Sequence, residues 1–300
     1  MKVTYERYPD LPKFLKTFVE YAATTLQARS IILTGDIVLD DFSNRYSTID
    51  IIVILEKNLW DKDYDTIDEF VNRLVVVNKE YTHISRIFFL PYALLSNPRV
   101  IHEDIEGMIV HKLHQEIISK YPLVQSEDYL IREKGYVLYG EDIRQHFPIP
   151  PIDGFWHQFL EQFSLLEKGA RSYPFQHTDI PDYDKAVNWI LDFSQILYSL
   201  KNNDIIGKMK SAYWFTNEHP GRMGDFVVEV ANCRKRNISL SSILEVVTRS
   251  RELMLFTLER VFRIKGIHIA KLRDLLKIED ETANFSRVFM EVRNIIENLR

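Results

Sequence analysis

The chain has 300 residues, of which 46% are hydrophobic and 27% charged, a balance typical of globular proteins with one or two sizeable cores. A net charge of −5 disfavours nucleic acid as the main partner, because duplex binding needs a basic surface. The single cysteine, Cys233, excludes an internal disulfide. The N-terminal sequence lacks a signal-peptide pattern and no apolar run is long enough to span a bilayer, so we expect a cytoplasmic protein without a membrane partner.

Three apolar segments in the first hundred residues have the character of buried strands. They cover residues 31–34, 49–55 and 84–90, and near-continuous runs of Ile and Val suit strands that are covered on both faces. Two amphipathic helices are predicted beside them, over residues 11–26 and 64–81, because their apolar residues recur at helical spacing. The order helix, strand, strand, helix, strand indicates a sheet covered by helices.

Helical patterns predominate from about residue 107 onward. A break follows at a group of turn residues, Gly140, Pro148, Pro150 and Pro151. We place the domain boundary there, with an N-terminal domain of residues 1–145 and a helical domain of residues 150–300. A further division of the helical domain near residue 237 is an alternative. The predicted fold class is therefore α+β, a mixed sheet with helices followed by an all-α domain. The further helices expected are 106–120, 126–138, 155–171, 183–200, 207–217, 242–264 (opened by a capping box, Ser242 to Glu245) and 281–299, with a loop at 173–181.

A polar motif lies at the end of the first predicted strand and at the start of the second. Thr34-Gly35-Asp36 closes the first strand, and Thr48-Ile49-Asp50 opens the second. This pattern resembles the signature of the nucleotidyltransferase (DNA polymerase beta-like) superfamily, in which Gly-Ser follows one strand and Asp-x-Asp lies on the next. Residues two apart on a strand share a face, so Asp-x-Asp directs two carboxylates into one pocket. With a third carboxylate from the following strand they hold two Mg²⁺ ions that bridge the nucleotide phosphates.

A second resemblance is to the streptomycin/spectinomycin (aminoglycoside) adenylyltransferases. The segment 133–140 is similar to the link that closes their N-terminal domain, and the segment 191–220 is similar to a helix pair of their C-terminal domain. In the second segment the matching residues are Tyr198-Ser199-Leu200, Gly207-Lys208 and Trp214. The resemblance implies Mg²⁺ and ATP as cofactors and transfer of a nucleoside monophosphate to a small hydroxyl acceptor. It also implies a nucleotide or small-molecule site in a cleft between the domains.

Three departures from the family pattern concern the metal site. Asp36 replaces the serine of Gly-Ser, Thr48 replaces the first acid of Asp-x-Asp, and the third strand, residues 83–90, has no Asp or Glu. One carboxylate holds Mg²⁺ weakly, and the charge of Asp36 would repel phosphates. We therefore expect a degenerate metal site and a protein that acts by binding a ligand or partner. The alternative is an active nucleotidyltransferase in which Asp40 or Asp41 assists Asp50.

The candidate site residues follow from the resemblance, except Asp40 and Asp41, which are chosen because they lie in the loop between the two motif strands. Asp50 is the catalytic and metal-binding candidate, with Asp40 and Asp41 as further metal ligands, and Gly35, Asp36 and Lys208 are the nucleotide-binding candidates. Lys208 would reach a phosphate or a substrate hydroxyl, or else is an ordinary surface lysine. Tyr213 and Trp214 either line the cleft or belong to the core.

Other patterns carry weaker hypotheses. His111 and His114 would share one face of a predicted helix, but a zinc site needs further ligands that the sequence does not offer. Arg171 and His177 are spaced as in helical ribonuclease toxins, although Pro174 interrupts the helix that this motif needs. Apolar residues on several faces of the segment 253–262 suggest a third hypothesis, an interaction protein or homodimer that works through its C-terminal helices.

Overall fold

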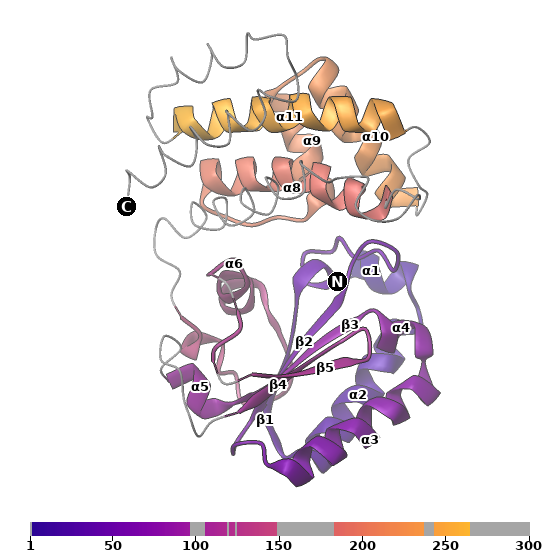
Figure 1. Cartoon of the computed structure of the whole chain (residues 1–300), viewed down its shortest axis with the longest axis vertical. Helices are drawn as coiled ribbons and strands as arrows, with labels where there is room; N and C mark the ends of the chain where they lie inside the picture. Colours follow the sequence, from indigo (N-terminus) through magenta and orange to yellow (C-terminus); the bar gives the residue numbers. More distant parts are fainter. Residues whose placement is uncertain are drawn as a thin grey trace. The chain divides into compact units, whose positions relative to one another are not determined.

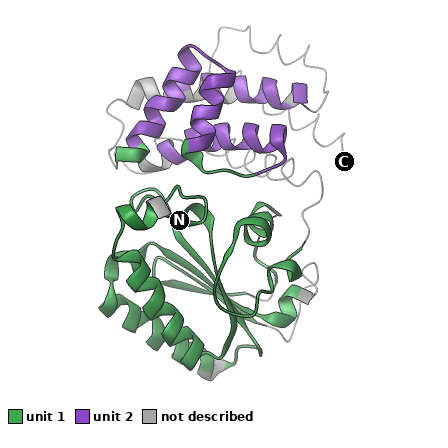
Figure 2. Ribbon diagram, turned by 180° about the vertical axis from the view of Figure 1, so that it is seen from behind, with its two compact units in different colours: residues 1–158, 205–209, 234–238 green, residues 159–204, 210–233, 239–300 purple. Residues whose placement is uncertain are grey.

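The computed structural model describes residues 2–96, 106–118, 120–123, 125–148, 183–236 and 243–264. The chain forms two compact units (Figure 2). Unit 1 comprises residues 1–158, 205–209 and 234–238, and unit 2 comprises residues 159–204, 210–233 and 239–300. Two short C-terminal segments thus belong to the unit that carries the sequence motifs.

Unit 1 is built on a mixed six-stranded sheet in the order β5-β4-β3-β2-β1-β6. Strands β2 and β3 are parallel, and all other neighbours are antiparallel. The parallel pair needs a crossover, which α3 and α4 supply. The strands are β1 (Ala28–Thr34), β2 (Ile49–Leu55), β3 (Ser85–Pro91), β4 (Gly107–His111), β5 (His114–Ile118) and β6 (Tyr136–Gly140), and the helices of this unit are α1 (Lys2–Arg7), α2 (Leu11–Thr25), α3 (Asp61–Val77), α4 (Lys79–His83), α5 (Tyr92–Ser96) and α6 (Gln125–Tyr129).

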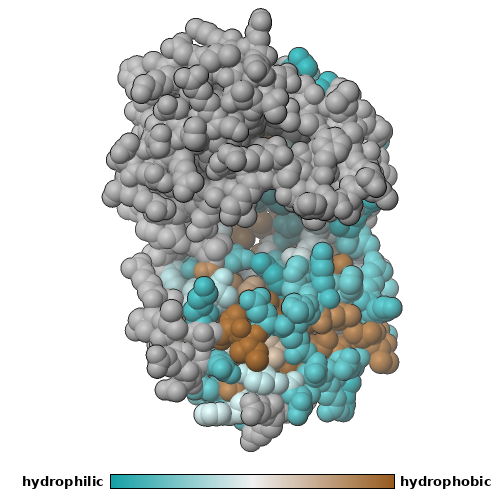
Figure 3. Space-filling view, viewed as in Figure 1, coloured by the Kyte–Doolittle hydropathy of each residue, from teal (hydrophilic) through white to brown (hydrophobic). Residues whose placement is uncertain are grey.

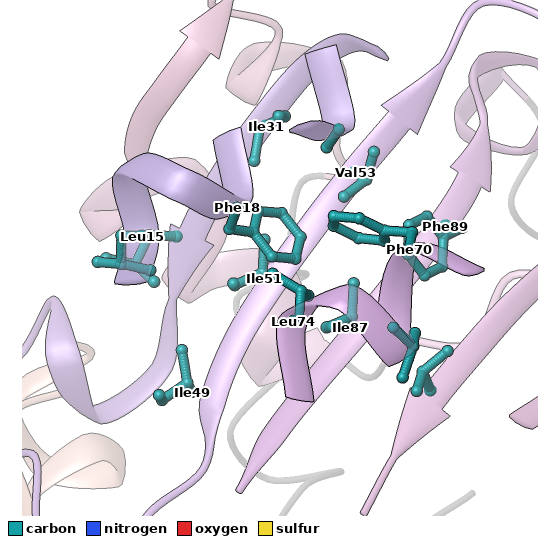
Figure 4. Packing of buried hydrophobic residues seen from close by; sticks show 14 of the residues in the cluster. Leu15, Phe18, Ile31, Ile49, Ile51, Val53, Phe70, Leu74, Ile87 and Phe89 are labelled. Carbon is teal, nitrogen blue, oxygen red and sulfur yellow. The ribbon is translucent and has the colours of Figure 1, made fainter. Parts of the chain in front are cut away.

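The two faces of the sheet bury separate apolar layers because successive side chains of each strand point to opposite faces. On one face, Ile51 and Val53 of β2 pack with Phe18 of α2 and Phe70 of α3 (Figures 1 and 4). The opposite face buries a second cluster that includes Ile52 and draws on β3, α5 and the segment around α6. On the face of unit 1 visible in Figure 3, hydrophilic side chains surround separate apolar patches.

The strands and helices predicted for the first ninety residues are confirmed with small shifts. The first strand begins three residues earlier than predicted, at Ala28, and the second has the predicted bounds. The helix predicted over residues 64–81 begins at Asp61 and is broken at Asn78, which has an extended backbone. Its side chain accepts a hydrogen bond from the Tyr81 backbone N–H at 2.9 Å and so starts α4.

The helix predicted over residues 106–120 is wrong, because this segment is the β4–β5 hairpin. Lys112 and Leu113 form its turn with φ angles of 52° and 65°. Two-residue hairpin turns of this kind favour Asn-Gly or Asp-Gly, so the usual sequence signal is missing here. The pairing of His111 with His114 across the hairpin also removes the shared helix face expected for them.

The helix predicted over residues 126–138 is wrong in its last four residues. Helix α6 ends at Tyr129, a π-helical turn covers Leu130–Lys134, and β6 then pairs with β1 at the edge of the sheet. Apolar spacing alone did not separate a helix from the edge strand that follows it, since short apolar runs fit both structures.

All the elements that the structure describes in unit 2 are helices. Helix α8 (Tyr183–Asn202), α9 (Lys208–Glu218) and α11 (Ile243–Ile264) agree with the predicted helices, and α10 (Arg222–Arg236) was not predicted. Rings from α9 and α11, Phe215 and Phe256, meet edge to face at 5.8 Å. The predictions for 155–171, 173–181, 281–299, Arg171, His177 and the capping residue Ser242 lie outside the described residues. None of the helices described is long and apolar enough to cross a membrane.

Candidate functional site

The turn after β1 brings the two halves of the sequence motif into contact. Gly35 has a φ of 73°, a conformation that favours glycine, and it opens a short 3₁₀ turn, Gly35–Ile37. Thr34 lies opposite Asp50 in the β1–β2 register. A Cβ atom added to Gly35 would collide with the Oδ2 atom of Asp50. Glycine is therefore needed at this position both for the backbone and for the space that the Asp50 carboxylate occupies.

Asp50 is buried and paired with an arginine from the next strand. Its Oδ1 atom accepts hydrogen bonds from Thr48 Oγ1 at 2.8 Å and from Arg86 Nε at 2.9 Å. Arg86 faces Asp50 directly in the parallel β2–β3 register, and its Nη2 atom lies 2.7 Å from Glu127 Oε1. Burial lowers the pKa of Arg86, but the two carboxylates raise it by more, so the guanidinium stays charged.

A second arginine, Arg234, pairs with Asp36 in the turn after β1. It is only 1% exposed, and its Nη2 atom donates to Asp36 Oδ2 at 2.6 Å and to Ser47 Oγ at 2.8 Å. Ser47 Oγ in turn donates to Asp36 Oδ2 at 2.6 Å. Burial raises the pKa of Asp36, but Arg234 and then Lys208 lower it by more, and the net pKa lies below its usual value.

Asp41 binds the N-terminus of α9. Its Oδ2 atom accepts from the Lys208 backbone N–H at 2.8 Å, and its Oδ1 atom accepts from the Met209 N–H at 3.2 Å. These are among the N–H groups that a helix leaves without internal partners. A Cβ on Gly207 would lie 2.7 Å from the Asp41 Cβ, so glycine permits this approach. Burial, and then the charge of Asp36, raise the pKa of Asp41 to about 6.

The Asp40 carboxylate binds Thr4 of α1. Its Oδ1 atom accepts hydrogen bonds from the Thr4 backbone N–H at 2.9 Å and from Thr4 Oγ1 at 3.0 Å. The two acids that the sequence offered as assistants of Asp50 therefore direct carboxylate oxygens to Thr4 and to the first turn of α9. The structure places Asp36, Asp41 and Lys208 together around Arg234, and places Asp50 with Arg86.

The described residues show which ligands a magnesium ion would find near Asp50. Across the described ranges, no group of three or more His, Cys, Asp or Glu side chains lies close enough together to hold a metal. Mg²⁺ in proteins needs near-octahedral oxygen coordination from carboxylates and waters. Here the nearest charged partner of the Asp50 carboxylate is a guanidinium.

The two aromatic candidates of α9, Tyr213 and Trp214, differ in their exposure and packing. Trp214 packs edge to face on Tyr198 of α8, with ring centroids 5.3 Å apart, and Lys201 Nζ lies 5.5 Å from its ring centre. Tyr213 is 44% exposed. Trp214 therefore packs between α8 and α9, whereas Tyr213 faces solvent.

Sequence reasoning missed the two arginines that neutralise the acids, Arg86 and Arg234, and also Glu127, the second carboxylate that Arg86 binds. The signal for Arg86 was available, because strands aligned at residues 50 and 86 would place both side chains on one face of the sheet. Arg234 lies at the end of α10, a helix that the sequence analysis did not predict. Its distance along the chain from Asp36 left no local pattern to detect.

The buried carboxyl group of Asp128, the residue after Glu127, should make the stability of the protein depend on pH. Burial raises the pKa of Asp128 to about 7, against an ordinary value of 3.8, although Tyr121 donates a hydrogen bond to it. Because the folded state holds this proton more tightly than the unfolded state, stability contributed by Asp128 falls as the pH rises from about 4 to about 7. Asp128→Asn should therefore match the wild-type protein at pH 5 and exceed its stability at pH 8 by roughly 2 kcal/mol.

Urea unfolding at the two pH values measures this difference. The surface variant Asp65→Asn serves as the control, since Asp65 is an exposed acid of α3. Equal stability of Asp128→Asn and the wild-type protein at both pH values would contradict the prediction.

The mixed sheet of unit 1 and the helices that follow it form a nucleotidyltransferase-like α+β fold. The supporting comparison is with the crystal structure of spectinomycin adenyltransferase AAD(9) from Enterococcus faecialis, determined with ATP and spectinomycin. The TM-score is 0.51 and the identity 12%, over 83% of this chain and 97% of that one. A scan of the sequence against protein-family models finds no match, and a search of curated proteins finds none either. The fold class predicted from the sequence is thus confirmed, and at this identity the likeness concerns the fold alone.

Proposed function

We propose that this chain uses a nucleotidyltransferase-like fold to bind a ligand or partner without metal-dependent nucleotidyl transfer. The observation that carries the proposal is the 2.9 Å hydrogen bond from Arg86 Nε to Asp50 Oδ1. A metal at Asp50 would have to displace a charged guanidinium that is also held by Glu127. The desolvated Asp50 carboxylate already has a positive partner, which lowers its tendency to bind a cation from solution.

The surroundings of Asp36 support the same proposal. The triphosphate of a nucleotide needs hydrogen-bond donors, and helix or turn N–H groups usually supply them. Here the turn carries the partly buried Asp36 carboxylate, and Arg234 donates hydrogen bonds to that carboxylate and to Ser47. A phosphate placed at this turn would be repelled by the negative charge of Asp36.

The alternative is an active enzyme that transfers AMP from ATP to a small hydroxyl acceptor. The similar structure favours it, since that protein is a spectinomycin adenyltransferase and was solved with ATP and spectinomycin. In this case Asp50 would be the residue on which metal binding depends, and Arg86 would have to move away when Mg²⁺ and ATP bind.

Calorimetric titration of Mg-ATP separates the two functions. We expect no binding up to about 1 mM nucleotide, a limit of roughly 4 kcal/mol of binding free energy. Asp50→Asn and the exposed-site control Asp65→Asn should behave like the wild-type protein. Micromolar binding that disappears only in Asp50→Asn, together with transfer of AMP to an acceptor such as spectinomycin, would overturn the proposal and establish the enzyme.

A further inference from the structure

The β4–β5 hairpin forms one edge of the sheet of unit 1 (Figure 1). Among the described residues, no strand pairs with the outer side of β5. An edge strand offers N–H and C=O groups to another chain, and many proteins block it with a proline, a lysine or a β-bulge. The five residues of β5, His114–Ile118, include no proline or lysine, and their pairing with β4 has no register shift. This edge is therefore regular and unblocked along its described length.

The strand at the opposite edge of the sheet, β6, is irregular. Tyr139 pairs with Ile31 of β1, but Val137 pairs with Ile32, so one residue of β6 is bulged. A bulge twists an edge strand and disturbs the ladder that a further strand would continue. The two edges of this sheet therefore differ in their capacity to accept another strand.

The two-residue turn of the hairpin fixes which backbone groups of β5 point outward. His111 and His114 close the turn as register partners, and the closing pair of such a turn exchanges hydrogen bonds. The direction of the backbone groups alternates along an antiparallel strand. The N–H and C=O groups of Gln115 and of Ile117 therefore point away from β4, toward the open side of the edge.

Two apolar side chains on this edge are exposed, Leu113 by 39% and Ile117 by 54%. Ile117 lies opposite Met108 of β4, which belongs to the core beneath α2 and α3, so Ile117 is on that face of the sheet. Gln115 shares the face and donates a hydrogen bond to Asp68 of α3. A strand laid along β5 would remove apolar surface from water at this border.

The sequence of β5 is complementary to itself when Gln115 lies on a two-fold axis. A closed dimer has two-fold symmetry, and two copies of one edge strand then pair antiparallel. With Gln115 opposite its own copy, Leu113 lies beside Ile117 of the second copy, and His114 lies opposite Glu116 of the second copy. The first pair is apolar, and in the second an imidazole N–H can donate to a carboxylate. The outward backbone groups of Gln115 also meet as a hydrogen-bonded pair in this register.

The other two-fold registers of β5 match less well. An axis at Glu116 sets two carboxylates against each other, which is repulsive. An axis at His114 sets two imidazoles opposite each other. An axis at Ile117 sets Glu116 opposite the apolar Ile118. The charge pattern of the strand thus favours the axis at Gln115.

We propose that two copies of this chain pair antiparallel through β5, with a two-fold axis at Gln115, so that the sheet continues from one copy into the other. The pairing of His114 with Glu116 selects a second copy of the chain as the occupant of this edge. Because β5 has five residues and small interfaces are weak, we expect a dissociation constant on the order of 10 µM. The inference goes beyond the proposed function, since an active enzyme and a metal-free protein could both pair through this edge.

Sedimentation equilibrium of the full chain, from about 1 to about 200 µM protein, measures the association. The mass of the wild-type protein should rise from one chain to two. His114→Glu sets two carboxylates against each other at both ends of the contact, and Glu116→Lys sets an ammonium group against each imidazole. Each variant should weaken the association at least about tenfold. A wild-type protein that stays monomeric throughout would overturn the inference.

Reversal of the pair tests the register. His114→Glu/Glu116→Lys exchanges the two partners and should recover the association. An equimolar mixture of the two single variants should also form a mixed dimer, because the new glutamate of one meets the new lysine of the other. Both substituted side chains are exposed, and circular dichroism checks that the variants fold. A loss that neither the double variant nor the mixture recovers would contradict this register.

Cysteine cross-linking provides a second measurement of the register, in a Cys233→Ser background that removes the native thiol. His114→Cys and Glu116→Cys copies, mixed under oxidising conditions, should form a disulfide, because their Cα atoms would lie about 4.5 Å apart. Each variant alone should cross-link at least about tenfold more slowly, since its two copies lie diagonally at about 7–8 Å. Equal rates in the mixture and in the single variants would overturn the pairing.

The opposite edge of the sheet supplies the matched control. Tyr139 of β6 is 42% exposed, and Tyr139→Glu adds a charge to that edge as His114→Glu does to β5. Tyr139→Glu should leave the association of the wild-type protein unchanged. A dimer that is lost in Tyr139→Glu and kept in His114→Glu would show that copies meet at β6 instead, and would overturn the inference.

Discussion

Replacing Arg234 by methionine should lower the free energy of unfolding by about 3–5 kcal/mol, the cost of breaking a buried ion pair by removing one partner. Arg234 is 1% exposed and donates to Asp36, to Ser47 and to the Asp41 backbone carbonyl at 2.6, 2.8 and 3.2 Å. Without the guanidinium, the partly buried Asp36 carboxylate and the buried Asp41 carboxylate lose the cation that pairs with both. Urea denaturation followed by circular dichroism measures the loss.

Two further variants test whether the loss comes from the ion pairs of Arg234. Arg236→Met removes an exposed arginine two residues after Arg234 in α10. It should change the free energy of unfolding by less than about 0.5 kcal/mol. The double variant Arg234→Met/Asp36→Asn should recover part of the loss, because it also removes the carboxylate charge that Arg234 neutralised. A loss in Arg234→Met as small as that of Arg236→Met would contradict the buried ion pair.

A second large effect is expected from Gly35→Ala, which should destabilise the protein by about 3 kcal/mol. Its φ of 73° imposes on alanine a backbone cost of about 1–2 kcal/mol. The added Cβ would also collide with Asp50 Oδ2, so the carboxylate must leave its hydrogen bonds to Thr48 and Arg86. Thermal and urea unfolding measure the change.

Gly221→Ala is the matched control for this effect. Gly221 has a φ of 103° and no atom within 4 Å of an added Cβ, so alanine there meets the backbone strain alone. The difference between the two variants reports the contact of Gly35 with Asp50. Equal losses would show that the Asp50 carboxylate adjusts freely, which is incompatible with a fixed pairing to Arg86.

The accuracy of sequence-based prediction followed the strength of the local pattern. The β-branched runs around Ile31, Ile51 and Ile87 predicted the three central strands, and the helical spacing of Phe18 and Phe70 predicted the helices that cover them. The β4–β5 hairpin was missed because its turn residues, Lys112 and Leu113, do not carry a turn signal. Edge strands such as β6 are short, and their periodicity is too weak to decide between helix and strand.

By itself the sequence determined the class of fold, since the motif at Gly35 and Asp50 and the absence of acids on the third strand are local features that survive folding. Only the tertiary structure decided what those acids do. Asp50 meets Arg86 through strand register, and Asp36 meets Arg234 across 198 positions of the chain. Ion pairing depends on distance in space, and a sequence does not record which distant charges a fold brings within 3 Å of each other.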